Sequence, residues 1–271
     1  MAKAAVHLPP VRAEIVELST GNRISPQNFQ VRVDVRAREL KALGVATGDR
    51  VYLLASFRLD FLVDLFALMT LRVVVGIGDR EQVNFEREAI ERQIAPGFSI
   101  IDGHVRKNTV VSEPKLPPDT AFIIFTSGTS ALPKAVVHTY ENLAFRFESA
   151  RSALGDAVMD TTISFLPLHF AHGLIGICLS SLFQSRRFLL PPDLSIASFS
   201  RASDWIDEYK VTFLSGTPAT WNLLLRLSKP PQMGTLRRVQ MASALATTQQ
   251  FLDLRRWSGC DVWNAYGTSE T

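Results

Sequence analysis

The sequence has few of the features that mark several protein classes. Its two cysteines, Cys178 and Cys260, lie far apart without CxxC spacing, so zinc-binding and thioredoxin-like motifs are excluded. The formal net charge is only +3, and the basic pairs are scattered without interleaved aromatic residues, which argues against a nucleic-acid partner. The chain has no HExxH motif, no Ser-His-Asp order and no paired carboxylates in a matching context, so a hydrolase is disfavoured.

Long hydrophobic segments are also absent. The most apolar stretch, residues 61–77, is interrupted by Asp64 and Arg72 and is too short to cross a bilayer. The first seven residues lack the apolar core of a secretory signal peptide. We therefore expect a cytoplasmic protein without a membrane span. With 46% hydrophobic and 20% charged residues, the chain is able to bury the core of a globular enzyme.

Predicted helices and strands alternate along the chain. Helical patterns cover residues 29–40, 60–71, 86–94, 140–154, 174–183, 200–209, 221–227 and 248–257. Short apolar runs predict strands at residues 51–55, 73–77, 99–101, 121–125, 161–166, 187–190, 211–215, 236–241 and 261–264. Asp60 and Thr139 are the expected N-caps of two of the helices. This alternation predicts an α/β fold with largely parallel sheets flanked by helices.

A proline-rich segment separates the predicted elements into two groups. Residues 108–119 contain three prolines and form the best linker candidate. We therefore expect one α/β subdomain over residues 1–115 and a second over residues 116–271. The candidate binding loops all follow predicted strands, which is where ligands bind in open α/β sheets.

The most informative segment is residues 123–134, which read IIFTSGTSALPK. An apolar strand ends there at a cluster of hydroxyl residues around Gly128, whose backbone N–H groups and hydroxyls can bind phosphate oxygens. Lys134 adds a cation that can reach the same phosphate. The order of residues differs from that of a Walker A loop, GxxxxGK[ST]. Taken alone, the segment is also consistent with a polar turn.

A second motif lies at residues 264–271, which read NAYGTSET after a predicted strand. The ring of Tyr266 can stack on adenine, and a hydroxyl that follows Gly267 can donate to phosphate. The Glu270 carboxylate is a hard oxygen ligand of the kind that Mg²⁺ prefers. A surface turn is the alternative interpretation of this segment.

Together these motifs resemble the adenylate-forming superfamily, which includes acyl- and aryl-CoA ligases, nonribosomal-peptide adenylation domains and luciferase-like enzymes. Residues 123–134 are similar to its phosphate loop, and residues 264–271 to its Tyr-Gly-x-Thr/Ser-Glu motif. Between these two motifs, weaker similarities to the family occur in the family's order at residues 166–174, 215–218 and 236–245. The resemblance implies two stacked α/β subdomains, as in the large N-terminal domain of AMP-forming synthetases. At this length we expect a truncated domain, with the C-terminal domain and its lysine absent.

The resemblance also implies roles for individual residues. Three residues would be catalytic, and the third would also hold Mg²⁺: Thr126, Lys134 and Glu270. The residues that would bind ATP are Thr126, Ser127, Gly128, Thr129, Ser130, Lys134, Ala242, Ser243, Ala244, Asn264, Ala265, Tyr266, Gly267, Thr268 and Ser269. An acid-binding pocket would be lined by His169, Phe170, His172 and Gly173.

Several positions depart from the superfamily pattern. Ala131 and Ala135 stand where the phosphate loop usually has glycine, and Ala242 and Ser243 replace glycines of the adenine turn. Glycine serves where φ must be positive or where a ligand approaches the backbone closely. These replacements therefore predict a tightened or altered nucleotide site.

The implied reaction is attack of a carboxylate on the α-phosphate of ATP, giving acyl-AMP and pyrophosphate. Transfer to CoA, or to the phosphopantetheine thiol of a carrier protein, would follow. A fatty or aromatic acid is favoured because the pocket segment has few charged residues. A second chain that supplies the missing half is a further expected partner. The alternative function is a catalytically incomplete nucleotide- or acyl-binding partner subunit. For His138, His169 and His172, a structural and a catalytic role stay equally open.

Overall fold

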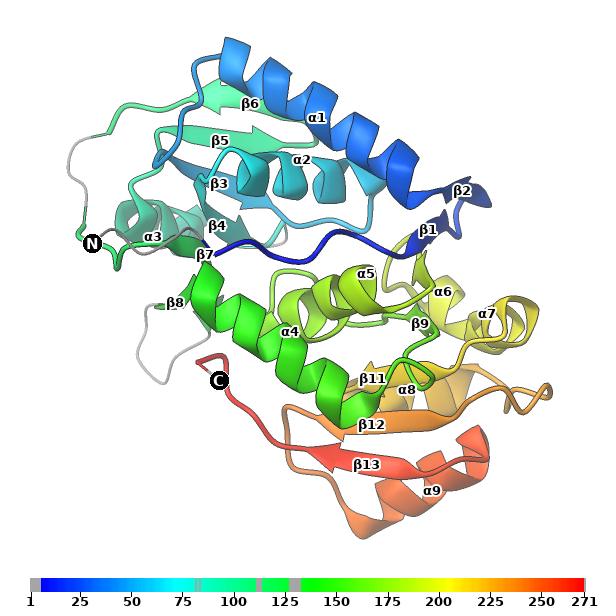
Figure 1. Cartoon of the computed structure of the whole chain (residues 1–271). Coiled ribbons are helices and arrows are strands. Elements are labelled where there is room, and N and C mark those ends of the chain that lie inside the picture. Colours follow the sequence, from blue (N-terminus) through cyan, green and yellow to red (C-terminus); the bar gives the residue numbers. More distant parts are fainter. Residues whose placement is uncertain (1–5, 81, 83, 111–113, 127–132, 271) are drawn as a thin grey trace.

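The computed structural model describes residues 6–80, 82, 84–110, 114–126 and 133–270. Within these residues the strands form two sheets, and helices pack against both (Figure 1). Sheet A has seven strands, in the order β13 (Val262–Ala265), β12 (Arg238–Ala242), β11 (Phe213–Gly216), β9 (Thr161–Ile163), β10 (Arg187–Leu190), β1 (Glu14–Glu17) and β2 (Asn22–Ile24). Sheet B has six, in the order β6 (His104–Lys107), β5 (Phe98–Ile101), β3 (Arg50–Leu54), β4 (Val74–Gly78), β7 (Thr120–Thr126) and β8 (Lys134–Thr139).

The helices separate most consecutive strands, as the sequence pattern predicts. They are α1 (Pro26–Ala42), α2 (Leu59–Thr70), α3 (Asn84–Ile94), α4 (Tyr140–Leu154), the π-helix η1 (His172–Leu179), α5 (Ser180–Gln184), α6 (Ile196–Ser200), α7 (Ala202–Tyr209), α8 (Pro218–Leu227) and α9 (Thr248–Ser258). None of the helices in the described part of the chain combines the length and the hydropathy that a membrane span requires.

Two predicted helix caps have different outcomes. Thr139 caps α4 as predicted, because its side chain accepts a hydrogen bond from the backbone N–H of Asn142. The prediction for α2 is wrong, because Arg58 occupies the N-cap position and Asp60 lies inside the first turn. There the carboxylate favours the helix through the positive end of its dipole instead of through a capping hydrogen bond.

Most neighbouring strands are parallel, which confirms the predicted fold class. The antiparallel strands are β2, β6 and β8, each at an edge of its sheet. The parallel pairing of β11 with β12 and of β12 with β13 brings the carboxyl ends of these strands to one edge of sheet A. Open parallel sheets bind their ligands at this edge.

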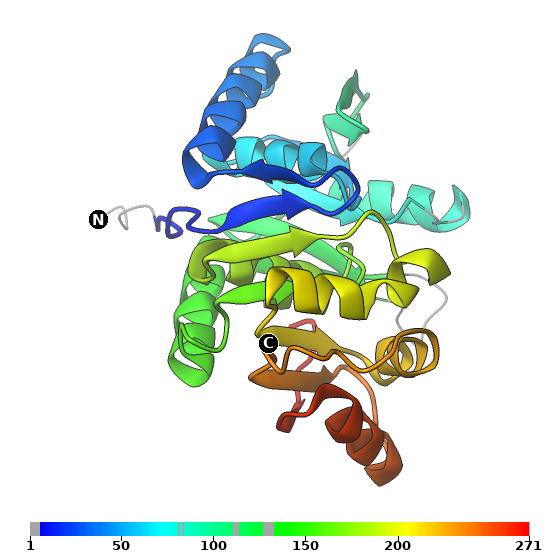
Figure 2. The same cartoon turned by 90° about the vertical axis from the view of Figure 1, so that its right-hand side faces the viewer.

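The two sheets do not divide the chain at residue 115. The N-terminal strands β1 and β2 belong to sheet A, where β1 pairs in parallel with β10 (Figure 2). Strands β7 and β8, which follow the proline-rich segment, complete sheet B. Burial explains why β1 belongs to sheet A. Its residues Ile15 and Val16 are both fully buried, each in the apolar cluster on one face of the strand. The boundary expected at residue 115 therefore does not separate the sheets.

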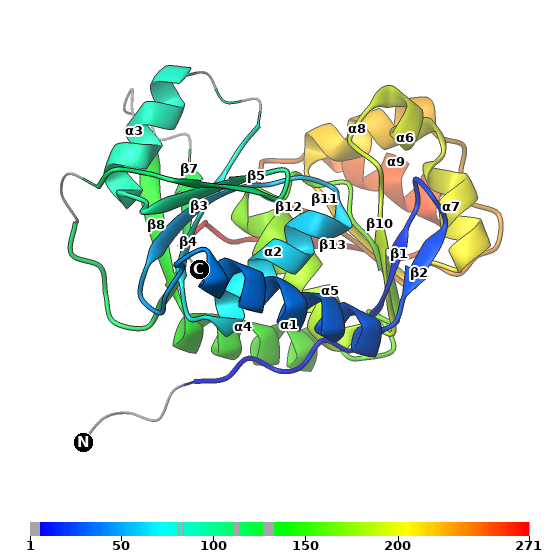
Figure 3. The same cartoon turned by 90° about the horizontal axis from the view of Figure 1, so that it is seen from above.

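The three larger clusters of buried apolar side chains hold much of the described chain together. The largest cluster joins α1, α2, α4, η1 and α5 to both sheets. A second cluster lies between sheet A and α6 to α9, and contains the fully buried rings of Trp205 and Trp221. A third packs α3 onto sheet B through Ile90 and Ile94. Figure 3 shows α3 and the group of α6 to α9 over different sheets.

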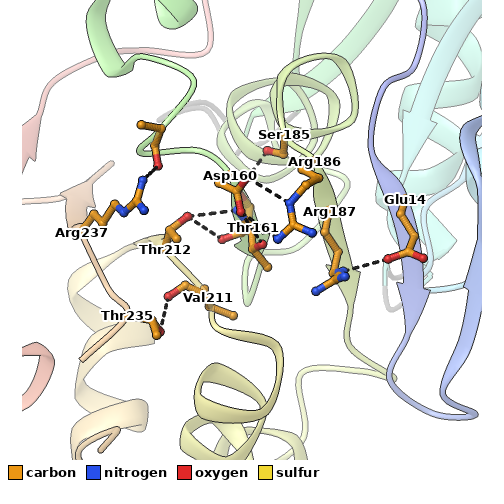
Figure 4. Close-up of polar contacts among 12 residues, drawn as sticks. Glu14, Asp160, Thr161, Ser185, Arg186, Arg187, Val211, Thr212, Thr235 and Arg237 are labelled. Atoms are coloured by element: carbon orange, nitrogen blue, oxygen red, sulfur yellow. Dashed lines mark hydrogen bonds and ion pairs between the residues drawn. The ribbon is translucent and has the colours of Figure 1, made fainter. Parts of the chain in front are cut away.

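The amino ends of the central sheet A strands are held by polar contacts (Figure 4). Arg187 donates from Nε to Glu14 at 2.8 Å and thereby joins β10 to β1. The Thr212 hydroxyl donates to the Thr161 carbonyl at 3.1 Å and accepts from the Thr161 N–H at 3.0 Å, linking β11 to β9. These contacts stabilise the edge opposite the motif-bearing loops, so that edge has a structural role.

Candidate functional site

The β7–β8 hairpin brings two of the predicted catalytic residues together. Thr126 ends β7, Lys134 begins β8, and the two are register partners across the antiparallel pair. The predicted phosphate-binding residues Ser127, Gly128, Thr129 and Ser130 lie outside the described residues. The hairpin therefore places a hydroxyl and a cation on the two sides of the predicted phosphate loop.

The third predicted catalytic residue reaches the hairpin from the other sheet. Lys134 Nζ lies 3.0 Å from Glu270 Oε1, and both side chains are exposed. The hydrogen bond from Lys134 is the main cause that lowers the pKa of the Glu270 carboxyl below its usual range. This ion pair connects β8 of sheet B with the segment that follows β13 of sheet A (Figure 1). Two motifs separated by more than a hundred residues thus meet at one place.

The donor set around Glu270 fits the expected magnesium ion in one respect. No group of three or more metal-ligating side chains occurs among the residues that the structure describes. Mg²⁺, however, is commonly bound through one or two carboxylates together with substrate phosphates and water. A single exposed, ionised carboxylate beside Lys134 matches that pattern, so the residues present fit the ion.

The predicted adenine-binding segments lie side by side on sheet A. The register of β12 and β13 pairs Met241 with Asn264 and Ala242 with Ala265, so both strands end at the same edge. Beyond them the residues Ala244, Gly267 and Thr268 are exposed. Tyr266 leaves 95% of its surface open to solvent, which leaves its ring available for a stacked base.

Ser243 has the backbone conformation that a glycine adopts easily. Its φ is +68°, in the left-handed region that side chains disfavour. The sequence predicts that serine in place of glycine alters this turn. In the structure the serine has the left-handed backbone conformation and adds a hydroxyl group. That hydroxyl lies 2.9 Å from Nδ1 of His172.

His172 is held by hydroxyl groups at both ring nitrogens. Nε2 lies 2.8 Å from Oγ of the buried Ser215, while Nδ1 faces Ser243. Burial, followed by the neighbouring positive charge of Arg146, lowers the pKa of His172 to about 4. The ring is therefore neutral near pH 7, with one nitrogen donating and the other accepting.

A small pocket lies beside Thr126, at the carboxyl ends of β4 and β7. It has a volume of about 140 Å³ and is lined by Ile77, Asp79, Gln82, Glu86, Phe125, Thr126, Pro133, His169 and Phe170. Nδ1 of His169 lies 3.5 Å from Oδ1 of Asp79, and the His169 and Phe170 rings contact each other at 4.1 Å between centroids. The pocket combines apolar walls with the carboxylates of Asp79 and Glu86, which come from outside the segment that carries His169 and Phe170. The preference for a fatty or aromatic acid stays a prediction.

Gly173 and His138 are both buried behind the exposed motifs. A Cβ atom at Gly173 would overlap the carbonyl oxygen of Pro167, so close packing requires glycine at this position. Burial, followed by the charge of Arg146, lowers the pKa of His138, while the backbone of Ser269 and the carboxylate of Glu270 act to raise it. His138 on β8 thus lies near the C-terminal motif, and the contribution of Gly173 to an acid pocket stays a prediction.

A larger surface pocket lies away from the motifs. Its volume is about 620 Å³ and it is lined by Arg237, Arg255, Arg256, Gly259, Cys260 and Asp261. Arg237 and Asp261 precede β12 and β13, so this pocket lies at the amino ends of the strands. We place the candidate site at the carboxyl ends, where Thr126, Lys134 and Glu270 converge.

Sequence reasoning missed several residues around the site. Asp79 and Gln82 follow the carboxyl end of β4, whereas Ser215, near the end of β11, lies in the motif segment 215–218 but was given no role of its own. The position of Asp79 just after a predicted strand was a usable signal, because this edge of a parallel sheet collects polar ligand-binding groups. Arg146, on α4, acts on both His138 and His172 through its charge and had no such signal.

A sequence model of the family described as AMP-binding enzyme matches residues 77–271. The chain belongs to this family. A 4-chlorobenzoate–CoA ligase from Arthrobacter sp. is 25% identical over 98% of the chain, and the match covers 57% of that ligase. The chain therefore spans little more than half the length of this relative.

Solved structures of other AMP-binding enzymes share the fold. The AMP complex of the O-succinylbenzoate Coenzyme A synthetase from Bacillus subtilis gives a TM-score of 0.78 at 21% identity, over 97% of this chain and 72% of that one. The N-terminal domain of FACL13 from Mycobacterium tuberculosis gives 0.79 at 20% identity, over 97% of this chain and 73% of that one. At this identity the comparison shows the fold: the α/β architecture of an AMP-forming synthetase N-terminal domain.

Proposed function

We propose that the chain contributes the nucleotide- and acid-binding part of a ligase that activates a carboxylic acid with ATP. The observation that carries this proposal is the convergence of Lys134 and Glu270 at 3.0 Å, next to Thr126 and at the end of the predicted phosphate loop. Membership of the AMP-binding enzyme family and similarity to a CoA ligase support it.

In the proposed reaction a carboxylate oxygen of the acid attacks the α-phosphorus of ATP. The bond from that phosphorus to the oxygen bridging to the β-phosphorus breaks, and pyrophosphate leaves with that electron pair. Lys134 neutralises phosphate charge, and the Thr126 hydroxyl donates a hydrogen bond to a phosphate oxygen. Glu270 would hold Mg²⁺, which when bound neutralises phosphate charge. Lys134 and Glu270 form an exposed ion pair, which phosphate contacts replace when the nucleotide binds.

The acceptor of the acyl group is a thiol, either CoA or the phosphopantetheine arm of a carrier protein. The pocket beside Thr126, at about 140 Å³, is smaller than most complete ligand sites. It therefore accommodates one part of the acid, with Phe125 and Phe170 in contact with its apolar portion. A fatty or aromatic acid remains our proposal for the substrate class, and Asp79 and Glu86 favour one that also carries a hydrogen-bond donor.

Two measurements on the purified chain test the function. Calorimetry with ATP and Mg²⁺ reports nucleotide binding, and carboxylate-dependent ATP–pyrophosphate exchange across fatty and aromatic acids reports adenylation. Binding together with exchange supports the ligase. Binding without exchange, for every acid in the panel, supports the nucleotide-binding partner subunit. A chain that does not bind ATP would overturn both.

A further inference from the structure

Three separate segments meet at the imidazole ring of His172. Ser215 is the last residue but one of β11, Ser243 follows β12, and His172 begins the π-helix η1. The hydroxyls of the two serines lie 2.8 and 2.9 Å from the two ring nitrogens. The ring therefore connects the turn that is proposed to bind adenine with the segment that is proposed to border the acid.

The two hydroxyl partners of His172 differ in exposure. The ring itself lies beside η1, since a Cβ atom built at Gly176, one turn along the helix, would be in ordinary van der Waals contact with its Cδ2 at 3.4 Å. Ser215 is buried, with 2% of its surface exposed, and its hydroxyl has a defined position on the strand. Ser243 is exposed, which makes it the partner of His172 that a ligand can contact directly.

The contact from Ser243 exists only because a side chain is present at a left-handed position. At a φ of +68° glycine would be the less strained residue, but it has no hydroxyl to offer. The turn thus retains a disfavoured backbone conformation together with a hydrogen bond to the acid segment. Unusual backbone conformations of this kind concentrate at functional sites.

We propose that Ser243 is a positioning residue that couples the two parts of the site: nucleotide binding at the turn after β12 holds the Ser243 hydroxyl in place and so orients His172. This inference rests on the proposed function, because it takes the turn to be the nucleotide site. A nucleotide that orders the turn also orders the wall of the acid segment, so the acid then binds to a prearranged surface. Preorganisation of this kind gives positive coupling between two ligands.

The test uses AMP as the probe and the His172 ring as the reporter. The chain has five histidines, so isotope-labelled imidazole signals are resolvable by NMR, and a His172→Gln variant assigns the signal of interest. In the native chain we expect the His172 signal to shift along the AMP binding curve measured by calorimetry. In Ser243→Gly, which suits the left-handed backbone, and in Ser243→Ala, the Kd for AMP is measured first by calorimetry, and the His172 shift should be lost even at AMP concentrations that saturate each variant.

A matched control is Ser200→Ala, because the Ser200 hydroxyl makes only a local contact with the Ala197 carbonyl on α6. It should keep both AMP binding and the His172 shift. A His172 signal that moves as far in either Ser243 variant as in the native chain would overturn the coupling. Loss of AMP binding in both Ser243 variants would also overturn it, since Ser243 would then be a direct nucleotide contact. Failure of the native chain to bind AMP would instead overturn the proposed function, on which the coupling proposal rests.

Discussion

At the scale of single residues, the exposed side chains of the site contribute little to the stability of the fold. Lys134 and Glu270 form an ion pair whose side chains are 65% and 49% exposed. Exposed pairs of this kind contribute about 0–1 kcal/mol to stability, because water screens both charges. Their effect on bound phosphate and on folding is therefore separable by mutation.

Lys134→Ala should weaken ATP binding without unfolding the chain. Loss of a charge-assisted contact to phosphate corresponds to about 1.5–3 kcal/mol, or roughly a ten- to hundredfold rise in Kd by calorimetry. Lys41→Ala, which removes an exposed lysine from the last turn of α1, is the matched control and should bind as the native chain does. Equal ATP affinity in the Lys134 variant and in this control would remove Lys134 from the site.

Tyr266→Ala should weaken AMP and ATP binding to the same extent. Stacking of a base on an aromatic ring contributes about 1–3 kcal/mol, and both nucleotides carry the same base. Since 95% of Tyr266 is exposed, its removal should leave the thermal midpoint unchanged. Tyr266→Phe keeps the ring face and should bind nearly normally. If Phe proved as damaging as Ala, the hydroxyl would be the group that matters.

At the scale of elements, local signals predicted some segments well and others poorly. Strand β10 and helix α4 have the predicted bounds, because an apolar run and a capping threonine mark them clearly. The helix predicted at residues 174–183 is instead η1 followed by α5, whereas the one predicted at 200–209 corresponds to α7, which begins two residues later. Apolar spacing does not distinguish a π-helix from an α-helix, because both bury a continuous apolar face.

Helices α1 and α2 offer an element-scale test through a buried ion pair. Arg36 Nε lies 2.6 Å from Oδ1 of Asp64, whose side chain is 4% exposed, and burial raises the pKa of Asp64. Arg36→Met leaves this carboxylate buried without its partner and should lower the free energy of unfolding by about 3–5 kcal/mol in urea titrations. Arg32→Met, at an exposed position of the same helix, should change it by less than about 0.5 kcal/mol.

The double variant Arg36→Met/Asp64→Leu distinguishes the loss of the ion pair from the cost of leaving the Asp64 carboxylate buried without a partner. With both charges gone, no uncompensated carboxylate remains, so much of the lost stability should return. If the double variant were less stable than Arg36→Met alone, Asp64 would contribute through contacts other than this ion pair.

At the scale of the whole molecule, the fold class was predictable but the exchange of strands between sheets was not. Alternating helices and strands indicate parallel sheets where consecutive strands are joined by a single helix. The pairing of β1 with β10 joins residues about 170 positions apart, and nothing in either apolar run specifies that partner. The same holds for the site. The motifs identified Lys134 and Glu270 individually, whereas their contact depends on how two sheets pack.

Acid stability is a whole-molecule property to which His172 and His138 contribute. Burial lowers the pKa of both rings, to about 4 for His172. A histidine whose folded pKa lies below its unfolded value binds protons more readily in the unfolded chain, so stability falls as the pH falls. For His172 the loss begins near its unfolded pKa of about 6.5 and is complete near pH 4. Across that window it amounts to roughly 3 kcal/mol at most.

Urea unfolding between pH 7.5 and pH 4 measures this dependence. We expect the native chain to lose stability across the window and His172→Gln to lose less, because glutamine takes up no proton. The variant starts from a lower stability, since its hydrogen bonds to Ser215 and Ser243 change, so the comparison concerns the slope with pH. His104→Gln, at an exposed position of β6, should keep the native slope. Parallel curves for His172→Gln and the native chain would show that the His172 ring takes up its proton equally well in the folded and unfolded states.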